Sequence, residues 1–224
     1  MAIARREVVV LARWPAPGRC KRRLAASIGS STRAAAMQRQ LTNHTLAVAA
    51  AASASCSAQL SLAVDGLGPR ASRRWQQRLQ ASSGCPSLQL LPQGNGNLGC
   101  RMHGQLRRCF AAGAEQVVLI GTDLPGLEPG DLEQAFVELN QAPVVLGPAC
   151  DGGYWLIGFN RAGFLSGSRR LMSGISWGSD QVLQQSLQEA ARLSLSVALL
   201  REQSDLDTAT SLSPWVQRQP SLLL

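Results

Sequence analysis

Lys21 is the single lysine of a chain in which the other 21 basic side chains, apart from histidine, are arginines. It follows an apolar run, Val8–Leu11, and a loop of prolines and glycine at 15–18. An ammonium is a compact point charge and a guanidinium is a planar fork, so a lone lysine indicates a position that arginine does not serve. A buried strand, a Gly/Pro loop and clustered positive charge also form phosphate sites in many folds. We predict that Lys21 belongs to such a site; the alternative is one more solvated charge on a basic helix.

Asp123 comes directly after a second apolar run, 117–121, and is followed by Pro125, which prevents regular continuation. A carboxylate at the end of a buried strand can hold a hard divalent cation against two phosphates. Aspartates before a proline are also common in turns and at helix caps. Asp123 is therefore a candidate metal ligand, with a simple turn as the alternative.

A third candidate segment contains Asp151, Gly152, Gly153 and Tyr154, the only tyrosine. Adjacent glycines permit positive φ angles and close backbone approach to a ligand. Because neighbouring strand residues face opposite ways, Tyr154 and Trp155 are expected to divide between the site and the core. A plain Asp-Gly turn between two strands explains the same segment.

Two further segments carry weaker signals. The glycine-rich stretch 94–99 leads into a helix, so its backbone N–H groups at Gly99 can meet an anion, to which Arg101 adds charge. Asp205 and Asp207, before Thr208, place two carboxylates near each other. Metal binding and helix capping fit this second segment equally well.

The elements that must position these residues alternate between short apolar runs and longer helical patterns. We predict strands at 8–12, 59–64, 87–91, 117–121, 144–147, 154–159 and 195–200. We predict helices at 32–52, 69–80, 98–112, 129–139 and 180–192, a loop or lid at 165–179, and a final helix after Asp207. Such alternation indicates an α/β fold with a mostly parallel sheet and helices on both faces. Ligands of these sheets bind at the carboxyl ends of the strands, where the candidate residues fall.

Length and composition indicate a single domain over residues 1–224, with a loose tail at about 217–224. The net charge of +8 suits an anionic ligand, but the basic residues are scattered in pairs and aromatics are few, which argues against nucleic acid. Six isolated cysteines without a C-x-x-C pair favour reduced thiols over a zinc site. No apolar run is long enough for a membrane span, so we expect a soluble, cytoplasmic protein.

Taken in order, these segments resemble one family. ARWPAPGRCKRRL is similar to its A-R-x-P-x-P-G-x-x-K-T-R-L opening, GNLGCRM to G-x-L-G-E-R-M, and IGTDLP to G-[ST]-D-x-P. GPACDGGYWLIG and SDLDT are similar to G-P-x-x-D-G-G-Y-x-L-I-G and D-x-D-T. The family is that of glycosyltransferase-like proteins associated with radical-SAM clusters and arsenosugar biosynthesis, in the nucleotide-diphospho-sugar transferase superfamily. Two positions depart from its pattern, Arg22 for threonine and Cys100 for glutamate, and either can alter acceptor choice.

The resemblance implies the three-layer, Rossmann-like GT-A fold and a set of site residues. The nucleotide would bind near Ala12, Arg13, Gly18, Lys21 and Arg23, with Gly99 and Arg101 as further candidates. Mg²⁺ or Mn²⁺ would bind at Asp123, with Asp207 as a second candidate ligand. Lys21, Asp123 and Asp151 would be catalytic, and Gly152, Gly153 and Tyr154 would meet the substrate or acceptor.

The leading functional prediction is a metal-dependent glycosyltransferase that moves a sugar from a nucleotide sugar to a small-molecule acceptor. The alternative enzyme is a nucleotidyltransferase that uses an NTP and releases pyrophosphate, as guanylyltransferases of the same fold do. The lone lysine beyond a Pro/Gly loop favours the second, whereas overall similarity favours the first. A nucleotide-binding regulator without catalysis is a third reading. The alanine-rich helix at 32–52 would pack either on its own domain or on a second copy in a homodimer.

Overall fold

The computed structural model describes residues 5–82 and 87–208, and within these ranges seven strands form one sheet. The strands are β1 (Arg6–Arg13), β2 (Ala58–Asp65), β3 (Gln89–Pro92), β4 (Gln116–Ile120), β5 (Val144–Pro148), β6 (Tyr154–Asn160) and β7 (Val197–Leu199). Their order across the sheet is β3-β2-β1-β4-β6-β5-β7. Every neighbouring pair is parallel except the two pairs made by β6, which runs against β4 and β5. The predicted mixed, mostly parallel sheet is confirmed.

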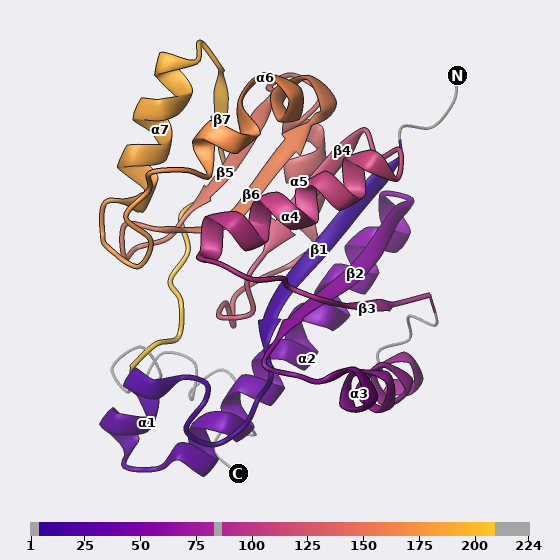
Figure 1. The fold of residues 1–224 in the computed structure, drawn as a ribbon, viewed down its shortest axis with the longest axis vertical. Helices are drawn as coiled ribbons and strands as arrows, with labels where there is room; N and C mark the ends of the chain where they lie inside the picture. The colour runs from indigo at the N-terminus through magenta and orange to yellow at the C-terminus, as the bar shows by residue number, and fades with distance from the viewer. Residues whose placement is uncertain (1–4, 83–86, 209–224) are drawn as a thin grey trace.

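Helices cover both faces of this sheet, which gives three layers (Figure 1). They are α1 (Arg22–Ile28), α2 (Ser31–Ser55), α3 (Pro69–Ser82), α4 (Leu98–Ala111), α5 (Pro129–Glu138), α6 (Arg161–Leu171) and α7 (Val182–Arg192). Helices α2, α3 and α5 pack on one face, and α4, α6 and α7 on the other. Helix α1 lies beyond the carboxyl end of β1, against the start of α2.

The central strand β1 shows why the sheet needs both layers. Val8 and Val10 point into the core beneath α2 and α5, whereas Val9 points into the core beneath α4. All three are fully buried. Continuous apolar runs, rather than alternating ones, are what a parallel strand covered on both faces requires.

The prediction of a loop over 165–179 is wrong for its first part, because α6 covers 161–171. Its serines and glycines reflect close packing rather than a turn. A β-carbon at Gly163 would lie 2.1 Å from the carbonyl oxygen of Pro143, and one at Gly167 would lie 2.5 Å from Leu195. The helix begins where it does because the Asn160 side chain accepts a hydrogen bond from the Gly163 N–H at 2.9 Å. Helix α1 was not predicted as a separate element, and the final helix after Asp207 lies outside the described residues.

We expect Asn160→Ala to lower the free energy of unfolding by about 1–2 kcal/mol. The side chain caps α6 and also donates to the carbonyl oxygens of Leu139 and Ala142 at 3.2 and 3.3 Å. Urea denaturation measures the change. Asn95→Ala, at an exposed loop position, is the matched control and should shift stability by no more than about 0.5 kcal/mol. Equal effects of the two substitutions would contradict the capping role.

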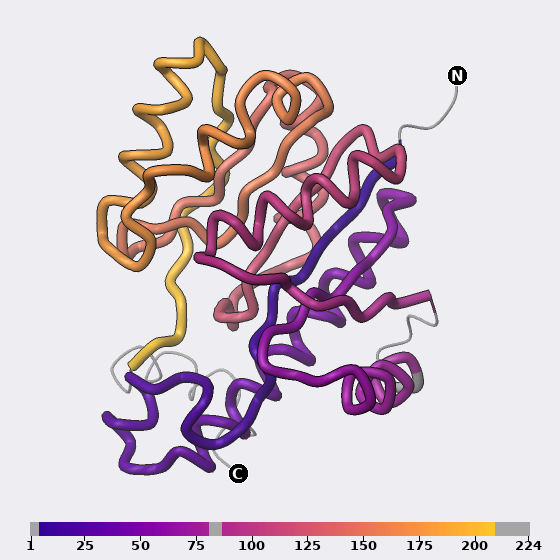
Figure 2. Tube along the Cα trace, viewed as in Figure 1, coloured from indigo at the N-terminus to yellow at the C-terminus, as the bar shows by residue number. Residues whose placement is uncertain are grey.

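The segment after β7 connects distant parts of the fold, and we call residues 200–207 the strap. The backbone of the strap follows β5, with hydrogen bonds from Leu200 N to Leu146 O and from Gln203 N to Pro148 O. It then donates from Leu206 N to Asp123 O at 2.9 Å, beyond the end of β4, before it reaches α1. Figure 2 shows this yellow trace running from the β7 side of the molecule to α1.

Candidate active site

A cavity of about 650 Å³ opens at the carboxyl ends of β1, β2 and β4. Because β6 runs antiparallel, its first residues lie at the same end of the sheet and line the cavity too. The charged residues of the lining are Arg13, Lys21, Arg22, Arg23, Asp65, Arg101, Asp123 and Asp207. Seven of the predicted site residues therefore surround one cavity, six of them charged and the seventh Tyr154, as the strand-end argument requires.

Lys21 extends from the start of α1 to the inner wall of this cavity. Its side chain is only 3% exposed. The ammonium lies 2.7 Å from Asp123 Oδ1 and 3.3 Å from Asp207 Oδ1, and it donates to the carbonyl oxygen of Leu206 at 2.5 Å. Segments separated by more than 180 residues thus meet at one nitrogen. The interpretation of Lys21 as a solvated surface charge does not fit this burial.

The strap adds carboxylates beside Lys21. Asp207 pairs with Lys21 through Oδ1 and with Arg23 through Oδ2. Burial and, to a smaller extent, the nearby charges of Asp207 and Asp151 together raise the pKa of Asp205 to about 6. The sequence analysis named Asp205 with Asp207 as a carboxylate pair, but only Asp207 was predicted as a site residue, and only Asp207 lines the cavity.

Asp123 is held in place from two directions. The neighbouring Thr122 accepts a hydrogen bond from the buried Gln38 side chain of α2 at 2.9 Å. The Asp123 carbonyl accepts the N–H of Leu206 from the strap. Its carboxylate remains half-exposed to the cavity. The backbone is thus fixed while the charged group is accessible to a ligand.

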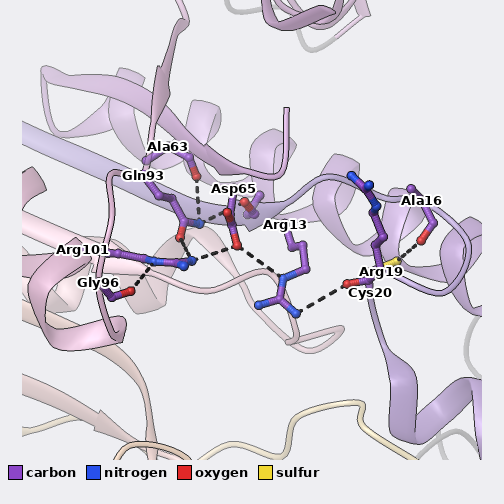
Figure 3. Close-up of polar contacts among 10 residues, drawn as sticks. Arg13, Ala16, Arg19, Cys20, Ala63, Asp65, Gln93, Gly96 and Arg101 are labelled. Atoms are coloured by element: carbon purple, nitrogen blue, oxygen red, sulfur yellow. Dashed lines mark hydrogen bonds and ion pairs between the residues drawn. The ribbon is translucent and has the colours of Figure 1, made fainter. Parts of the chain in front are cut away.

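A second charged group lies across the cavity at the ends of β2 and β3 (Figure 3). The carboxylate of Asp65 accepts a hydrogen bond from Arg101 at 2.8 Å and lies 3.7 Å from Arg13. The buried Gln93 side chain donates to the carbonyl oxygens of Ala12 and Ala63, at 3.0 and 3.2 Å. Arg13 and Arg101, from different elements, are therefore brought together by one carboxylate.

Sequence reasoning missed Asp65 and Gln93 as site residues. Neither residue was among the predicted site residues. A signal was present in both cases, because Asp65 ends the strand β2 and Gln93 directly follows the strand β3. The same argument that selected Asp123 would have selected these two.

The loop between β5 and β6 is a tight hairpin connection. Asp151 is exposed, and its Oδ1 accepts the Gly153 N–H at 3.0 Å. Gly152 has φ +85°, and a β-carbon there would lie 2.0 Å from the Asp180 carbonyl oxygen. The Leu183 N–H donates to the Gly152 carbonyl at 2.9 Å. The glycine at 152 is therefore explained by close packing against the segment before α7.

We expect Gly152→Ala to lower stability by about 1–2 kcal/mol and to displace the segment at 180–183. Gly104→Ala is the matched control, because a β-carbon there meets nothing within 4 Å inside α4. That control should gain about 0.5–1 kcal/mol, since alanine favours the helix. Chemical denaturation of both variants gives the test, and a neutral Gly152→Ala would contradict the packing argument.

Several predicted binding residues lie near the cavity without lining it. Gly99 is buried in α4, where a β-carbon would lie 2.2 Å from the Met172 carbonyl oxygen and 2.8 Å from Trp177. Ala12 is buried and offers its carbonyl to Gln93. Gly18 has φ +74° in the loop before α1. None of the three is among the lining residues, and neither are Asp151, Gly152 and Gly153 of the loop between β5 and β6.

Tyr154 lines the cavity with its ring, which meets Trp177 edge-on at 6.2 Å between centroids. Burial of the hydroxyl raises the pKa of Tyr154. This tyrosine therefore offers a wall to the cavity rather than a titrating group.

The carboxylates beside Lys21 have the donor chemistry of a magnesium or manganese site. Asp123 and Asp207 both approach one cation position, and hard oxygen donors of this kind suit either metal. No group of three or more His, Cys, Asp or Glu side chains in the described ranges is arranged to hold a metal ion. Water and phosphate oxygens would have to complete the coordination, which Mg²⁺ commonly accepts.

Comparison with solved structures places the fold. A protein from Desulfovibrio desulfuricans G20, provisionally assigned as a nucleotide-diphospho-sugar transferase, is 25% identical over 97% of this chain and 96% of its own, with a TM-score of 0.78. The inositol-1-phosphate CTP transferase of T. maritima shows the same fold at 16% identity, covering 98% and 96% of the two chains, with a TM-score of 0.58. Rv0371C of Mycobacterium tuberculosis, in complex with manganese, is 16% identical over 96% of this chain and 100% of its own, with a TM-score of 0.51.

Comparison with curated proteins gives no match. Among the helices of the described ranges, none has the length and apolar character needed to cross a membrane. A family model matches residues 34–179, a range that includes Asp123 and Asp151. The chain therefore belongs to the family described as "Uncharacterized protein conserved in bacteria (DUF2064)", and it has the nucleotide-diphospho-sugar transferase fold.

Proposed function

We propose that this chain is a transferase with a nucleotide-activated donor, and that it moves a sugar from a nucleotide sugar to a small acceptor. The observation that carries the proposal is the convergence of Lys21, Asp123 and Asp207 in a cavity that also holds Arg13 and Arg101. Fixed cations in a partly enclosed cavity stabilise the charge that develops on a leaving diphosphate. The similarity to the Desulfovibrio protein supports the same donor class.

In this proposal the acceptor hydroxyl oxygen bonds to the anomeric carbon while the bond from that carbon to the phosphate oxygen breaks. The nucleoside diphosphate leaves with the electron pair, and Lys21 and Arg13 stabilise its charge. Asp123 and Asp207 would hold the divalent metal, which neutralises the diphosphate when bound. Asp151 takes the proton from the acceptor hydroxyl.

We expect Asp151→Asn to reduce turnover about 100-fold without weakening the donor nucleotide, since an amide cannot take the proton. Steady-state kinetics with separate KM values for donor and acceptor measure the effect. Glu189→Gln, on α7, is a control for the loss of one carboxylate elsewhere. Full turnover by Asp151→Asn would remove this role from Asp151.

Nucleotidyl transfer is the second candidate. An anionic oxygen of a phosphorylated substrate would attack the α-phosphorus of an NTP, and pyrophosphate would leave. Five cationic side chains line the cavity, Arg13, Lys21, Arg22, Arg23 and Arg101, and they suit a triphosphate as well as a diphosphate. The likeness in fold to the CTP transferase of T. maritima agrees with this candidate.

A thermal-shift panel with Mn²⁺ separates the two candidates, with UDP-glucose, GDP-mannose, GTP, CTP and buffer as its arms. A ligand at about a hundred times its dissociation constant adds about 2.7 kcal/mol to stability. A shift with a nucleotide sugar, lost in Asp123→Ala, is the expected result for sugar transfer. A shift with an NTP alone would support nucleotidyl transfer. No shift with any nucleotide would contradict both enzymatic candidates.

A further inference from the structure

Lys21 is held in an unusual backbone state. Its φ and ψ are 46° and 47°, in the left-handed region that residues with a β-carbon avoid. Lys21 also occupies the N-cap position of α1, yet its side chain makes no capping hydrogen bond there. The side chain is directed instead into the cavity wall, where it is almost fully buried. The chain thus accepts local strain at the one residue that places an ammonium between Asp123 and Asp207.

All three N–H donors of the Lys21 ammonium are used in this arrangement. A lysine carries three N–H donors, and three acceptors surround this one: Asp123 Oδ1, Asp207 Oδ1 and Leu206 O. A phosphate oxygen can bind Lys21 only if one of these acceptors is given up. The present contacts of Lys21 with the carboxylates and a contact with phosphate are therefore mutually exclusive.

For the carboxylates, the contact with Lys21 and the binding of a divalent cation are likewise in competition. Oδ1 of Asp207 is bound to Lys21 and its Oδ2 to Arg23, so both oxygens already meet a positive charge. A divalent cation placed on Asp123 and Asp207 would lie within a few ångströms of the buried ammonium. Like charges at that distance repel strongly where water is scarce.

We propose that Lys21 is an internal counter-cation that keeps a divalent metal from Asp123 and Asp207 until nucleotide phosphates draw the ammonium away. Metal and nucleotide then bind cooperatively, each raising the affinity for the other by the same factor. This inference rests on the proposed function, because it assigns both ligands to the same cavity. It predicts that the protein without nucleotide binds metal weakly because of the positive charge of Lys21, and that substitution of Lys21 by a neutral residue strengthens metal binding.

The test is Mn²⁺ binding by the full chain without nucleotide, measured by the EPR signal of free Mn²⁺. Lys21→Met removes the charge with little change in volume, and we expect it to tighten Mn²⁺ binding tenfold or more. Lys21→Arg keeps a cation at the position and should not tighten it. Arg107→Met removes the same charge from an exposed side chain of α4 outside the cavity lining, and should change the affinity less than twofold.

Two further measurements secure the interpretation. Asp123→Asn added to Lys21→Met should abolish the gain, which assigns the binding to this pair of residues. Thermal unfolding should show Lys21→Met below wild type in EDTA and stabilised by Mn²⁺ more than wild type is. This comparison also shows that the variant folds.

An Mn²⁺ affinity of Lys21→Met that equals or falls below that of wild type would overturn the inference, as would equal tightening by Arg107→Met. These outcomes are separate from failure of the proposed function. If Lys21→Met binds Mn²⁺ more tightly but no nucleotide stabilises the protein in the thermal panel, the proposed function is contradicted and the counter-cation role of Lys21 is supported. If a nucleotide stabilises the protein but Lys21→Met does not bind Mn²⁺ more tightly, the counter-cation role is contradicted and the proposed function is supported.

Discussion

Lys21→Met is expected to lower turnover about 100- to 1,000-fold with whichever nucleotide donor the protein uses. The ammonium is the buried cation at the inner wall of the cavity, and in the proposed reaction it stabilises the charge that grows on the leaving group. Loss of one preorganised donor of this kind typically costs turnover by that factor. Donor affinity should fall as well, because the phosphates lose a positive partner.

Steady-state kinetics and nucleotide titration measure these two effects separately. Lys21→Arg is the informative comparison, since it keeps the charge but brings a wider, planar group to a buried position. We expect it to recover only part of the turnover. Arg22→Met is the control for the loss of one charge at the cavity, from an exposed side chain. Wild-type turnover and nucleotide affinity in Lys21→Met would show that Lys21 serves only the strap.

Arg201→Met is expected to lower the free energy of unfolding by about 3 kcal/mol. Arg201 binds both oxygens of Asp131, with Nε to Oδ1 at 2.5 Å and a second bond to Oδ2 at 2.8 Å. The Asp131 side chain is only 6% exposed. Removal of the arginine would leave a buried carboxylate with only the Gln203 amide and the Glu128 N–H as donors. The loss therefore falls at the lower end for a broken buried pair.

The strap gives this substitution a second consequence. Arg201 ties the strap to the start of α5, and the same strap brings Asp205 and Asp207 to Lys21. We therefore expect the variant to lose catalytic efficiency as well as stability, although Arg201 lies outside the cavity lining. Arg192→Met, at an exposed pair with Glu189, is the matched control and should change stability by less than about 0.5 kcal/mol. Equal stability of the two variants in guanidinium chloride would contradict the anchoring role.

The sheet was predictable because most of its strands are short apolar runs buried on both faces. The inner strands obey this rule, and β1 illustrates it with three fully buried valines, whereas the edge strands β3 and β7 are only partly buried. Helix α6 was not predictable in the same way. Its small residues look like a loop in sequence, and only the contact of Gly163 with Pro143 shows why they are small.

The candidate site was predictable to the extent that its residues directly follow strands. Asp123 lies just beyond β4 and Lys21 at the end of the loop that follows β1, and the structure places both on the cavity. The choice between metal binding and capping at Asp207 could not be made from spacing, because it depends on a partner 186 residues away. Gly99 shows the opposite problem, since a glycine before a basic residue suggests anion binding but here packs under Trp177. Long-range proximity and side-chain direction are the two quantities that local patterns do not contain.

The route of the strap has a consequence for biosynthesis. Lys21 emerges from the ribosome early, whereas Leu206 and Asp207 are added 185 and 186 residues later. Contacts of such high sequence separation are expected to form late in folding, because closing so long a loop costs conformational entropy. A nascent chain can therefore complete its sheet and helices while the cavity still lacks one wall. Ligand binding to ribosome-bound chains of increasing length should appear only after the strap has left the exit tunnel.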